Sequence, residues 1–548
     1  MLECREGEEG VAERPATAGE WGRVRWMEEG EEAVRRVGEE LGLWFDRWDM
    51  EYYRRLFCEE LRRNPTTVEL FDLSQSNSEH ARHWFFKGVL RIGGEEMGRS
   101  LMELVSETLE RNRTNSLVAY SDNASVVRGF RTVVCEPSEG GRASRVEERS
   151  AEYDVTFTAE THNFPTGVAP YPGAETGVGG RIRDGHAVGR GSVVVGGTAG
   201  YAVGQLRVPG YELEWEEGGW GYPGNVASPL EVLIGASNGA SDYANRFGEP
   251  LIAGYARAFG AVARGERREY VKPIMFSGGL GQIERGALRK GEVRSGMLVV
   301  KIGGPAYRIG IGGGAASSQV HGENREELDF NAVQRGDAEM EQRVDRVVRA
   351  CARMGRRNPI VSIHDQGSGG NANVLKELVG ALGARIEVDR FPLGDETLST
   401  LEIWCAEYQE NDAVLIEPES EELFASICER ERCPYACVGR VSGDGRVVLV
   451  ERGRERDEEQ PYCLPQEKVL GGMPRKVFES EAFSPLRWPL SVPAELEVGR
   501  ALRELVLPHV EVGSKRFLTS KVDRSVTGLV VQQPCVGPLH VPVADCGI

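Results

Sequence analysis

The stretch AEYDVTFTAETHNFPTG, residues 151–167, decides the fold. Apolar and polar side chains alternate from Tyr153 to Glu160, and this period of two predicts a half-buried β-strand. We expect Pro165 and Gly167 to end the strand. The polar run THN that follows the strand would then project from a rigid base, where binding and catalytic residues are often found.

Outward from this strand, acidic residues recur beside glycine. GAETGVGGRIRD, residues 173–184, predicts a turn whose backbone N–H groups can close on phosphate oxygens, with Arg183 gripping an anion and Asp184 holding Mg²⁺. SIHDQGSGGN, residues 362–371, repeats the order of strand, acid (Asp365) and glycine turn. Taken singly, such a run is more often a structural turn, and such a carboxylate is more often solvated or caps a helix.

Histidine and cysteine give weaker signals. NSEHARHW, residues 77–84, places His80 and His83 three positions apart, on one face if the segment is helical. Such a pair is more often structural than catalytic. The C-x₄-C-x₃-C run at residues 428–437 has no convincing fourth ligand nearby, so we interpret its cysteines as buried thiols.

Hydrophobic periodicity predicts helices on either side of the central strand. An amphipathic stripe over residues 53–61 predicts one helix, which Asn64–Pro65 ends before a second helix capped by Thr66 or Thr67. Further along, apolar residues at helical spacing over 344–351 predict another helix.

Strand and loop patterns complete the second half of the chain. MLVVKIGG at 297–304 and NPIVSIHD at 358–365 predict buried strands, and the glycines after the second strand open a helix. The charged, proline-bearing residues 451–466 predict a surface loop.

Length and composition bound the answer. The chain has 548 residues, which predicts three to four domains at about 150 residues each. The formal net charge of −19 argues against a protein that binds nucleic acid or a membrane surface, because both need basic patches. The 11 cysteines are odd in number and scattered, and no apolar run approaches the ~18 residues of a membrane helix, so we expect a cytoplasmic protein.

Familiar nucleotide motifs are missing. The sequence has no G-x-x-x-x-G-K-[ST] loop and no strand–GxGxxG–helix followed by an acid. A chain that handles ATP without these motifs must use another geometry.

Longer runs of the sequence carry a resemblance. Eight of them, in unbroken order over roughly residues 40–548, resemble the large, single-chain form of phosphoribosylformylglycinamidine synthase. They include NPTTVELFDLSQSNSEHARHWFFKG (64–88), TAETHNFPTGVAPYPGAETGVGGRIRD (158–184), GGPAYRIGIGGGAASS (303–318), HDQGSGGNANVLKEL (364–378) and LEIWCAEYQE (401–410). Eight motifs in one order are far more specific than any one of them.

The resemblance implies a reaction and an architecture. The reaction is the ATP-dependent conversion of formylglycinamide ribonucleotide and glutamine to the amidine, glutamate, ADP and phosphate in purine biosynthesis. The implied fold class is α/β (α+β): a helical linker precedes an AIR-synthetase-like unit with an N-terminal sheet domain and a C-terminal α/β sandwich domain. The second synthetase unit is present only at its start and the glutaminase has no counterpart, so the resemblance implies a partial chain.

The segments expected on this basis cover the whole chain. They are a disordered or irregular lead-in at 1–30, a helical linker at 31–80, an ATP-binding synthetase subdomain at 81–296, a C-terminal synthetase subdomain at 297–480, and a connection with the start of a second synthetase unit at 481–548.

The resemblance also implies site residues, and ATP and Mg²⁺ as cofactors. His80 resembles the active-site histidine, and His162 resembles a proton acceptor. The expected metal ligands are Glu160, Asp184, Asp365 and Asp545. The expected substrate contacts are Thr161, Asn163, Phe164, Arg183, Gln334, Glu407, Tyr408 and Gln409. The expected ATP contacts are His83, Gly173, Ala174, Glu175, Thr176, Gly177, Val178, Gly179, Gly180, Arg181, Ile182, Arg183, Asp184 and Ala544.

Two alternatives stay open at this point. The chain could be a nucleotide-binding half without turnover, or a scaffolding pseudoenzyme of the same family. A scaffold needs none of the retained residues Glu160, His162, Arg183 and Asp184, so their retention weighs against a scaffold. The expected partners are formylglycinamide ribonucleotide, ATP and ammonia, with neither nucleic acid nor membrane.

Overall fold

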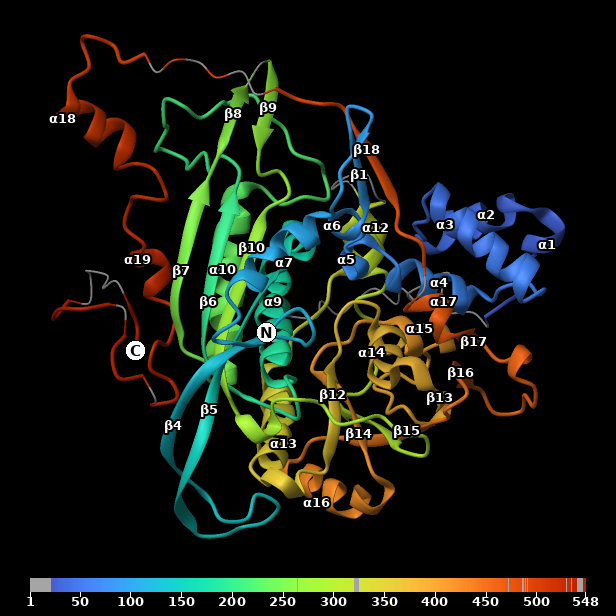
Figure 1. The fold of residues 1–548 in the computed structure, drawn as a ribbon. Helices are drawn as coiled ribbons and strands as arrows, with labels where there is room; N and C mark the ends of the chain where they lie inside the picture. The colour runs from blue at the N-terminus through green and yellow to red at the C-terminus, as the bar shows by residue number, and fades with distance from the viewer. Residues whose placement is uncertain are drawn as a thin grey trace, which may run out of the picture.

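In the part of the chain that the structure describes, the fold combines two large β-sheets and two small ones with a helical region that precedes them (Figure 1). The computed structural model describes residues 21–263, 265–319, 325–471, 473–484, 487, 489, 491–528, 530–533, 535–539 and 546–548. Of the lead-in expected at 1–30, residues 1–20 lie outside this range. The expectation of irregular structure is wrong for Trp26–Glu29, which form helix α1 with the Trp26 side chain buried.

The linker is helical, as predicted. Its elements are α2 (Glu31–Leu41), α3 (Arg47–Arg54), the π-helix η2 (Arg55–Glu60), α4 (Thr67–Ser76), α5 (Glu79–Arg82) and α6 (Trp84–Lys87). The predicted helix at 53–61 runs through α3 and η2, and it buries Tyr53 and Phe57. Thr66 caps α4: its hydroxyl accepts from the Glu69 N–H at 3.0 Å, and the Glu69 carboxylate accepts from the Thr66 N–H at 3.0 Å. The predicted break and restart of the helix are therefore confirmed.

The first sheet has six strands in the order β3-β4-β5-β10-β6-β7. The strands are β3 (Ser116–Val118), β4 (Ser125–Pro137), β5 (Val146–Thr161), β6 (Val193–Val203), β7 (Leu251–Ala258) and β10 (Ile274–Glu284). Neighbouring strands are antiparallel except β6 and β7. Helices α9 (Pro170–His186) and α10 (Pro229–Phe247) share an apolar core with this sheet.

The predicted strand at 153–160 is part of β5. The alternation suggests that its apolar face is buried and its polar face exposed, but most of the strand shows the reverse. The side chains of Val155 and Phe157 are 37% and 42% exposed, and Leu280 on the neighbouring β10 is 46% exposed. Asp154 and Thr156 are buried instead. One face of the first sheet therefore presents apolar side chains to solvent.

The glycine turn predicted over residues 173–184 is wrong, because residues 170–186 form the continuous helix α9. Its glycines allow close packing. A Cβ on Gly179 would lie 2.6 Å from the Tyr243 hydroxyl of α10, and a Cβ on Gly173 would lie 2.5 Å from the Pro165 carbonyl carbon. The strand β5 ends at Thr161, and Pro165 and Gly167 lie in the short helix α8 (Asn163–Val168) that leads into α9.

The second sheet has seven strands in the order β12-β14-β11-β15-β13-β16-β17. The strands are β11 (Leu298–Gly303), β12 (Ile360–Asp365), β13 (Gly383–Glu387), β14 (Asn411–Ile416), β15 (Tyr435–Val441), β16 (Arg446–Val450) and β17 (Tyr462–Pro465). The predicted strands at 297–304 and 358–365 are confirmed as β11 and β12. The predicted surface loop at 451–466 is wrong for β17, because Tyr462, Cys463 and Leu464 are buried at the sheet edge.

Helices cover both faces of the second sheet. On one face, α13 (Ala338–Ala352) and α16 (Glu421–Glu431) pack against Leu298 and Val300 of β11. On the other face, α14 (Gly370–Val379), α15 (Thr400–Cys405) and the linker helix α4 share a core with Val299. Figure 1 shows the linker in blue beside α14 and α15. The linker is therefore packed against the second sheet rather than the first.

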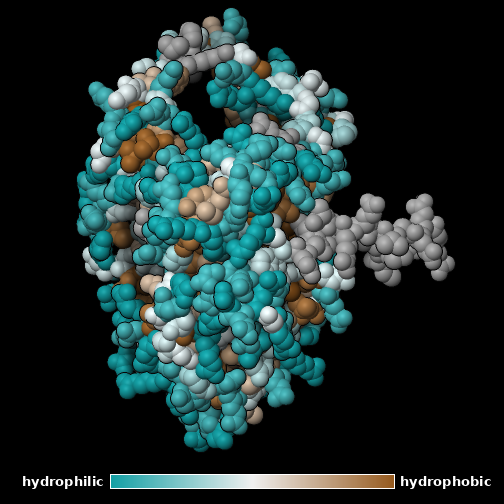
Figure 2. Space-filling view, turned by 90° about the vertical axis from the view of Figure 1, so that its right-hand side faces the viewer, coloured by the Kyte–Doolittle hydropathy of each residue, from teal (hydrophilic) through white to brown (hydrophobic). Residues whose placement is uncertain are grey.

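Shorter elements complete the chain. They are β1 (Val89–Ile92), β2 (Glu95–Glu96), α7 (Leu101–Arg111), β8 (Gly260–Ala263), β9 (Glu266–Glu269), α11 (Gly313–Ser318), α12 (Glu326–Ala332), α17 (Gln466–Val469), β18 (Val477–Ser480), α18 (Val498–Ala501), the π-helix η9 (Leu502–Val506) and α19 (Arg516–Thr519). The chain returns to the linker region through β18, which pairs in parallel with β1. The face seen in Figure 2 is mostly hydrophilic. Among the described residues, no helix is both long and apolar enough to cross a bilayer.

Candidate active site

A cavity of about 570 Å³ is lined by residues of the linker and of both sheet domains. Seventeen of the residues predicted for the site line it: His80, His83, Glu160, Thr161, His162, Asn163, Phe164, Thr176, Gly177, Gly180, Arg181, Arg183, Asp184, Gln334, Asp365, Glu407 and Gln409. Strand ends supply the acids, since Glu160 is near the end of β5 and Asp365 ends β12. The fold thus brings residues almost 330 positions apart in sequence to one cavity.

Three carboxylates form an acidic cluster, which we define as Glu160, Asp184 and Asp365. The Asn123 side chain connects two of them, because its Nδ2 donates to Asp184 Oδ1 at 3.1 Å and to Asp365 Oδ1. Burial among the cleft walls raises the pKa of Glu160 to about 7, and the charge on Asp365 acts in the same direction, although the Glu160 side chain remains open to the cavity. Burial, Asp365 and Glu160 together raise the pKa of Asp184.

The pKa values of Glu160 and Asp184 are raised because the acidic cluster is buried and its carboxylates repel one another. Burial alone would raise the pKa of Asp365 too, but hydrogen bonding and charge from His364 outweigh it and lower the value. No group of three or more His, Cys, Asp or Glu side chains in the described part of the chain could by itself hold a metal ion. Mg²⁺ commonly takes only one or two protein carboxylates and completes its shell with water and phosphate. A divalent cation at the acidic cluster would therefore have to take most of its ligands from phosphate and water.

His162 and His80 differ in their hydrogen bonding. His162 Nδ1 lies 2.6 Å from the Gly173 carbonyl oxygen, so Nδ1 is the donor and Nε2 is left as an acceptor in the neutral ring. Burial lowers the pKa of His162 to about 4, which keeps the ring neutral near pH 7. Burial in the cleft walls, with His83 and Lys272 nearby, also lowers the pKa of His80, whose ring stays accessible to solvent in the cavity.

Arg183 is a buried cation with free donors. Its Nη1 lies 2.9 Å from Glu341 Oε2 and 3.9 Å from Glu410 Oε1, and these carboxylates hold the guanidinium in place. Its Nε and Nη2 atoms are buried and find no hydrogen-bond acceptor among the described residues. Because buried N–H groups are rarely left unpaired, this arrangement favours an anionic or carbonyl ligand in the cavity.

The opposite wall offers free acceptors. Glu407 accepts from the Gly369 N–H at 2.8 Å and from the Gln334 amide, and burial raises the pKa of Glu407 to about 7. The side-chain carbonyl oxygens of Gln334 and Gln409 are buried, and no donor among the described residues reaches them. The wall therefore fits a ligand that carries N–H or O–H groups.

Some predicted residues lie elsewhere. Of the predicted ATP segment at 173–184, only Thr176, Gly177, Gly180, Arg181, Arg183 and Asp184 line the cavity, on one face of α9. The prediction of backbone N–H groups closing on phosphate is wrong, because those groups lie inside a helix and serve its own hydrogen bonds. The Tyr408 side chain is buried and bonds Asn371 instead of facing the cavity. Ala544 and Asp545 lie outside the described residues.

The structure adds residues that sequence reasoning missed: Asn123, Lys272, His364 and Glu377. His364 carries a local signal, since it precedes Asp365 directly. Asn123 and Lys272 lie in segments without any motif, and only the fold brings them to the cavity.

Comparison with known sequences follows this geometry. Three family models match: "Formylglycinamide ribonucleotide amidotransferase linker domain" at residues 34–83, "AIR synthase related protein, C-terminal domain" at 294–451, and "FGAR-AT PurM_N-like domain" at 514–548. "Probable phosphoribosylformylglycinamidine synthase, chloroplastic/mitochondrial" of Arabidopsis thaliana is 54% identical over 531 residues. This chain belongs to the phosphoribosylformylglycinamidine synthase family. The match covers 95% of the chain and 38% of the Arabidopsis relative.

Other members of the phosphoribosylformylglycinamidine synthase family give the same result. The "Phosphoribosylformylglycinamidine synthase" of Homo sapiens is 52% identical over 541 residues, which are 96% of this chain and 40% of the relative. The chain therefore spans about two fifths of the length of the relatives that it matches. The predicted resemblance is confirmed.

Solved structures agree on the fold. The structure described as "T. maritima PurL complexed with ADP" has a TM-score of 0.55 at 21% identity, covering 88% of this chain and 62% of that chain. "T. maritima PurL complexed with FGAR" has a TM-score of 0.53 at 23% identity, covering 81% and 59%. Together with the observed sheets, these matches confirm the predicted α/β class and the AIR-synthetase-like unit.

Proposed function

We propose that this chain carries the ATP-dependent synthetase step of phosphoribosylformylglycinamidine synthase. In this step the amide oxygen of formylglycinamide ribonucleotide is phosphorylated by ATP, and ammonia then displaces phosphate to give the amidine. The observation that carries the proposal is the convergence of the acidic cluster, two histidines and an arginine with free N–H groups on one cavity. Acids, imidazole and a guanidinium are the groups that phosphoryl transfer and amination require.

The residues of the cleft have distinct roles in this proposal. Glu160, Asp184 and Asp365 would hold Mg²⁺, which when bound neutralises charge on the triphosphate. Arg183 binds an anionic or carbonyl oxygen of the substrate through its two free N–H positions. The side-chain oxygens of Gln334 and Gln409, which accept no hydrogen bond from the described residues, orient substrate N–H or O–H groups. The name of one structural relative includes ATP and that of another includes FGAR, which supports these substrate classes.

The tautomer of His162 suggests how the two candidate catalytic roles are divided. His162 presents Nε2 as the acceptor of its neutral ring, beside the Gln334 side chain, and has a low pKa, so it accepts a proton from the attacking ammonia. His80 is on the linker side of the cavity and stabilises the phosphorylated amide.

Ammonia, rather than glutamine, is the nitrogen source that this chain can use. None of the described cysteines lines the cavity, and burial raises the pKa of Cys433 to about 12, so it is not a thiolate near pH 7. Glutamine hydrolysis would therefore depend on a glutaminase outside this chain. The expected cytoplasmic location stays a prediction, since the Arabidopsis relative is named chloroplastic/mitochondrial.

The test is phosphate release by this chain with ATP, Mg²⁺, formylglycinamide ribonucleotide and ammonium. We expect release only when all four are present, and a loss of roughly 10²-fold or more in His162→Ala. His509→Ala is the matched control, because His509 stacks on Trp215 outside the cavity. Calorimetry that finds Mg-ATP binding without any phosphate release would favour the nucleotide-binding half over the enzyme.

A further inference from the structure

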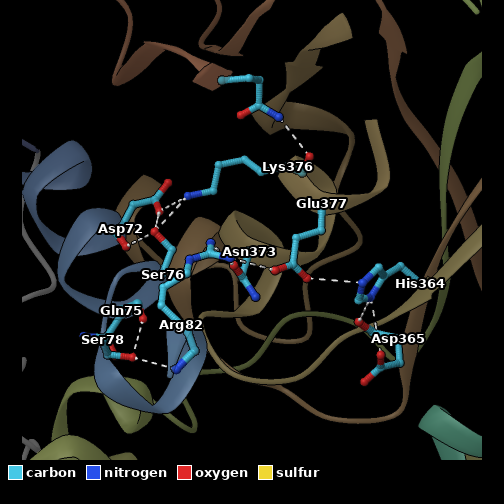
Figure 3. Close-up of polar contacts among 12 residues, drawn as sticks. Asp72, Gln75, Ser76, Ser78, Arg82, His364, Asp365, Asn373, Lys376 and Glu377 are labelled. Carbon is cyan, nitrogen blue, oxygen red and sulfur yellow. Dashed lines mark hydrogen bonds and ion pairs between the residues drawn. The ribbon is translucent and has the colours of Figure 1, made fainter. Parts of the chain in front are cut away.

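Helix α14 anchors the linker through a buried ion pair. Lys376 Nζ donates to Asp72 of α4 and, at 3.1 Å, to the Ser76 hydroxyl (Figure 3). Trp404 Nε1 donates to the second Asp72 oxygen at 3.1 Å. The side chains of Lys376 and Asp72 are fully buried. The docking of α4 on the second sheet domain is therefore secured at this point.

The next residue of α14 makes a second and different contact with the linker. Arg82 of α5 places Nη1 3.3 Å from Glu377 Oε1, and its Nη2 lies 3.4 Å from the Asn373 side-chain oxygen. The other Glu377 oxygen, Oε2, lies 3.2 Å from His364 Nε2. Glu377 thus joins the linker to β12, and Figure 3 shows these side chains in one continuous row.

His364 continues the row into the acidic cluster. Its Nδ1 lies 3.4 Å from Asp365 Oδ1 and 3.2 Å from the Asp365 carbonyl oxygen. Cation, anion and imidazole therefore follow one another in the order Arg82, Glu377, His364, Asp365. We call these four residues the relay. Their side chains are 17%, 26%, 26% and 12% exposed.

The relay is poorly suited to be a mere structural anchor. Partly exposed ion pairs at more than 3 Å contribute little to stability, and the buried Lys376–Asp72 pair already secures the same linker face. In metal sites, partners that hydrogen-bond a ligand fix its orientation, and their loss typically lowers metal affinity 10–100-fold. Within the relay, Arg82 and Glu377 lie behind His364 and the predicted ligand Asp365. This position fits a role in orienting a metal ligand.

We propose that Arg82 and Glu377 are positioning residues that orient His364 and Asp365 for the divalent cation of the acidic cluster. The linker thereby sets the affinity of the synthetase cleft for its cation. This inference rests on the proposed function, which makes Asp365 a cation ligand.

The test uses Mn²⁺ as the probe, titrated into the whole chain while free Mn²⁺ is measured by electron paramagnetic resonance. We expect Arg82→Gln and Glu377→Gln each to raise the Kd for Mn²⁺ about tenfold. Arg63→Gln is the matched control. Arg63 is also a linker arginine, is 14% exposed, and bonds Glu69 and the Cys463 carbonyl oxygen, away from the cleft. Its Kd should match the wild type.

Coupling between the residues gives a sharper readout than loss alone. The double variant Arg82→Gln/Glu377→Gln should bind Mn²⁺ no more weakly than Glu377→Gln, because both changes interrupt one row. Arg82→Lys, which keeps a cation for Glu377, should recover part of the affinity. If Arg82→Gln does not fold, Glu377→Gln carries the test by itself.

The outcomes separate the two proposals. An unchanged Kd in Glu377→Gln, or an equal loss in Arg63→Gln, overturns the relay while leaving the cation site in place. A wild-type chain that binds no Mn²⁺ overturns the cation assignment of the proposed function, and the relay falls with it.

Discussion

Replacing Lys376 with methionine removes one partner of the buried pair that docks the linker. Asp72 would then keep its charge in a fully buried position, with hydrogen bonds from Ser76 Oγ and Trp404 Nε1 only. Breaking a buried ion pair by deleting one partner costs about 3–5 kcal/mol. Because two hydrogen bonds to Asp72 survive, we expect the lower end, about 3 kcal/mol.

This loss should appear as local opening of the linker. Hydrogen exchange of the α4 amides is the assay, because a multidomain chain need not unfold in one step. A loss of about 3 kcal/mol corresponds to exchange roughly 10²-fold faster. Adding Asp72→Asn to Lys376→Met removes the unpaired charge and should recover most of the protection. If exchange in the single variant speeds up by less than about threefold, the pair does not hold the linker and the reasoning is refuted.

Two further changes test packing and charge. Gly179→Ala places a Cβ 2.6 Å from the Tyr243 hydroxyl, and this crowding should cost ~1–3 kcal/mol of stability and lower the thermal midpoint. Gly218→Ala is the control, because its Cβ would meet nothing within 4 Å, and its midpoint should not fall. Equal midpoints in the two variants would contradict the packing of α9 on α10. Glu407, with a pKa raised from 4.5 to about 7, holds its proton in the folded state at pH values where the unfolded chain has lost it, so stability falls as pH rises from about 4.5 to 7. Glu407→Gln should therefore flatten the pH dependence of the free energy of unfolding by up to about 3 kcal/mol over that window. An unchanged pH dependence would contradict the raised pKa of Glu407.

Local patterns predicted much of the fold. The period-two run in β5, the capping residue Thr66 and the apolar spacing over 344–351 each describe contacts within a few residues, and each prediction is confirmed. The prediction failed at α9, where glycine favours turns by its own propensity. There, close contact with Tyr243 and Pro165 outweighs that propensity, and such contacts cannot be read from the local sequence.

The candidate site was predictable only where a motif marks it. Glu160, His162 and Asp365 were found because they sit in recognisable runs at strand ends. Asn123 carries no motif, and Glu377 lies in the run 364–378 without a signal for its own role. Their contacts with residues 61 and 13 positions away are created only by the fold. The gripping role predicted for Arg183 overlooked Glu341, which already holds one side of the guanidinium.

The contacts between α14 and the linker have a consequence for biosynthesis. Asp72 and Lys376 are 304 positions apart, and Arg82 and Glu377 are 295 apart. At roughly 5–20 residues per second, the ribosome would need about 15–60 s to make the second member of each pair after the first. During that interval the second sheet domain is not yet available for the newly made linker to pack against. The apolar face of the linker therefore remains exposed to solvent. The linker thus depends on chaperones until the second sheet domain has been made, and the cleft cannot form before that point.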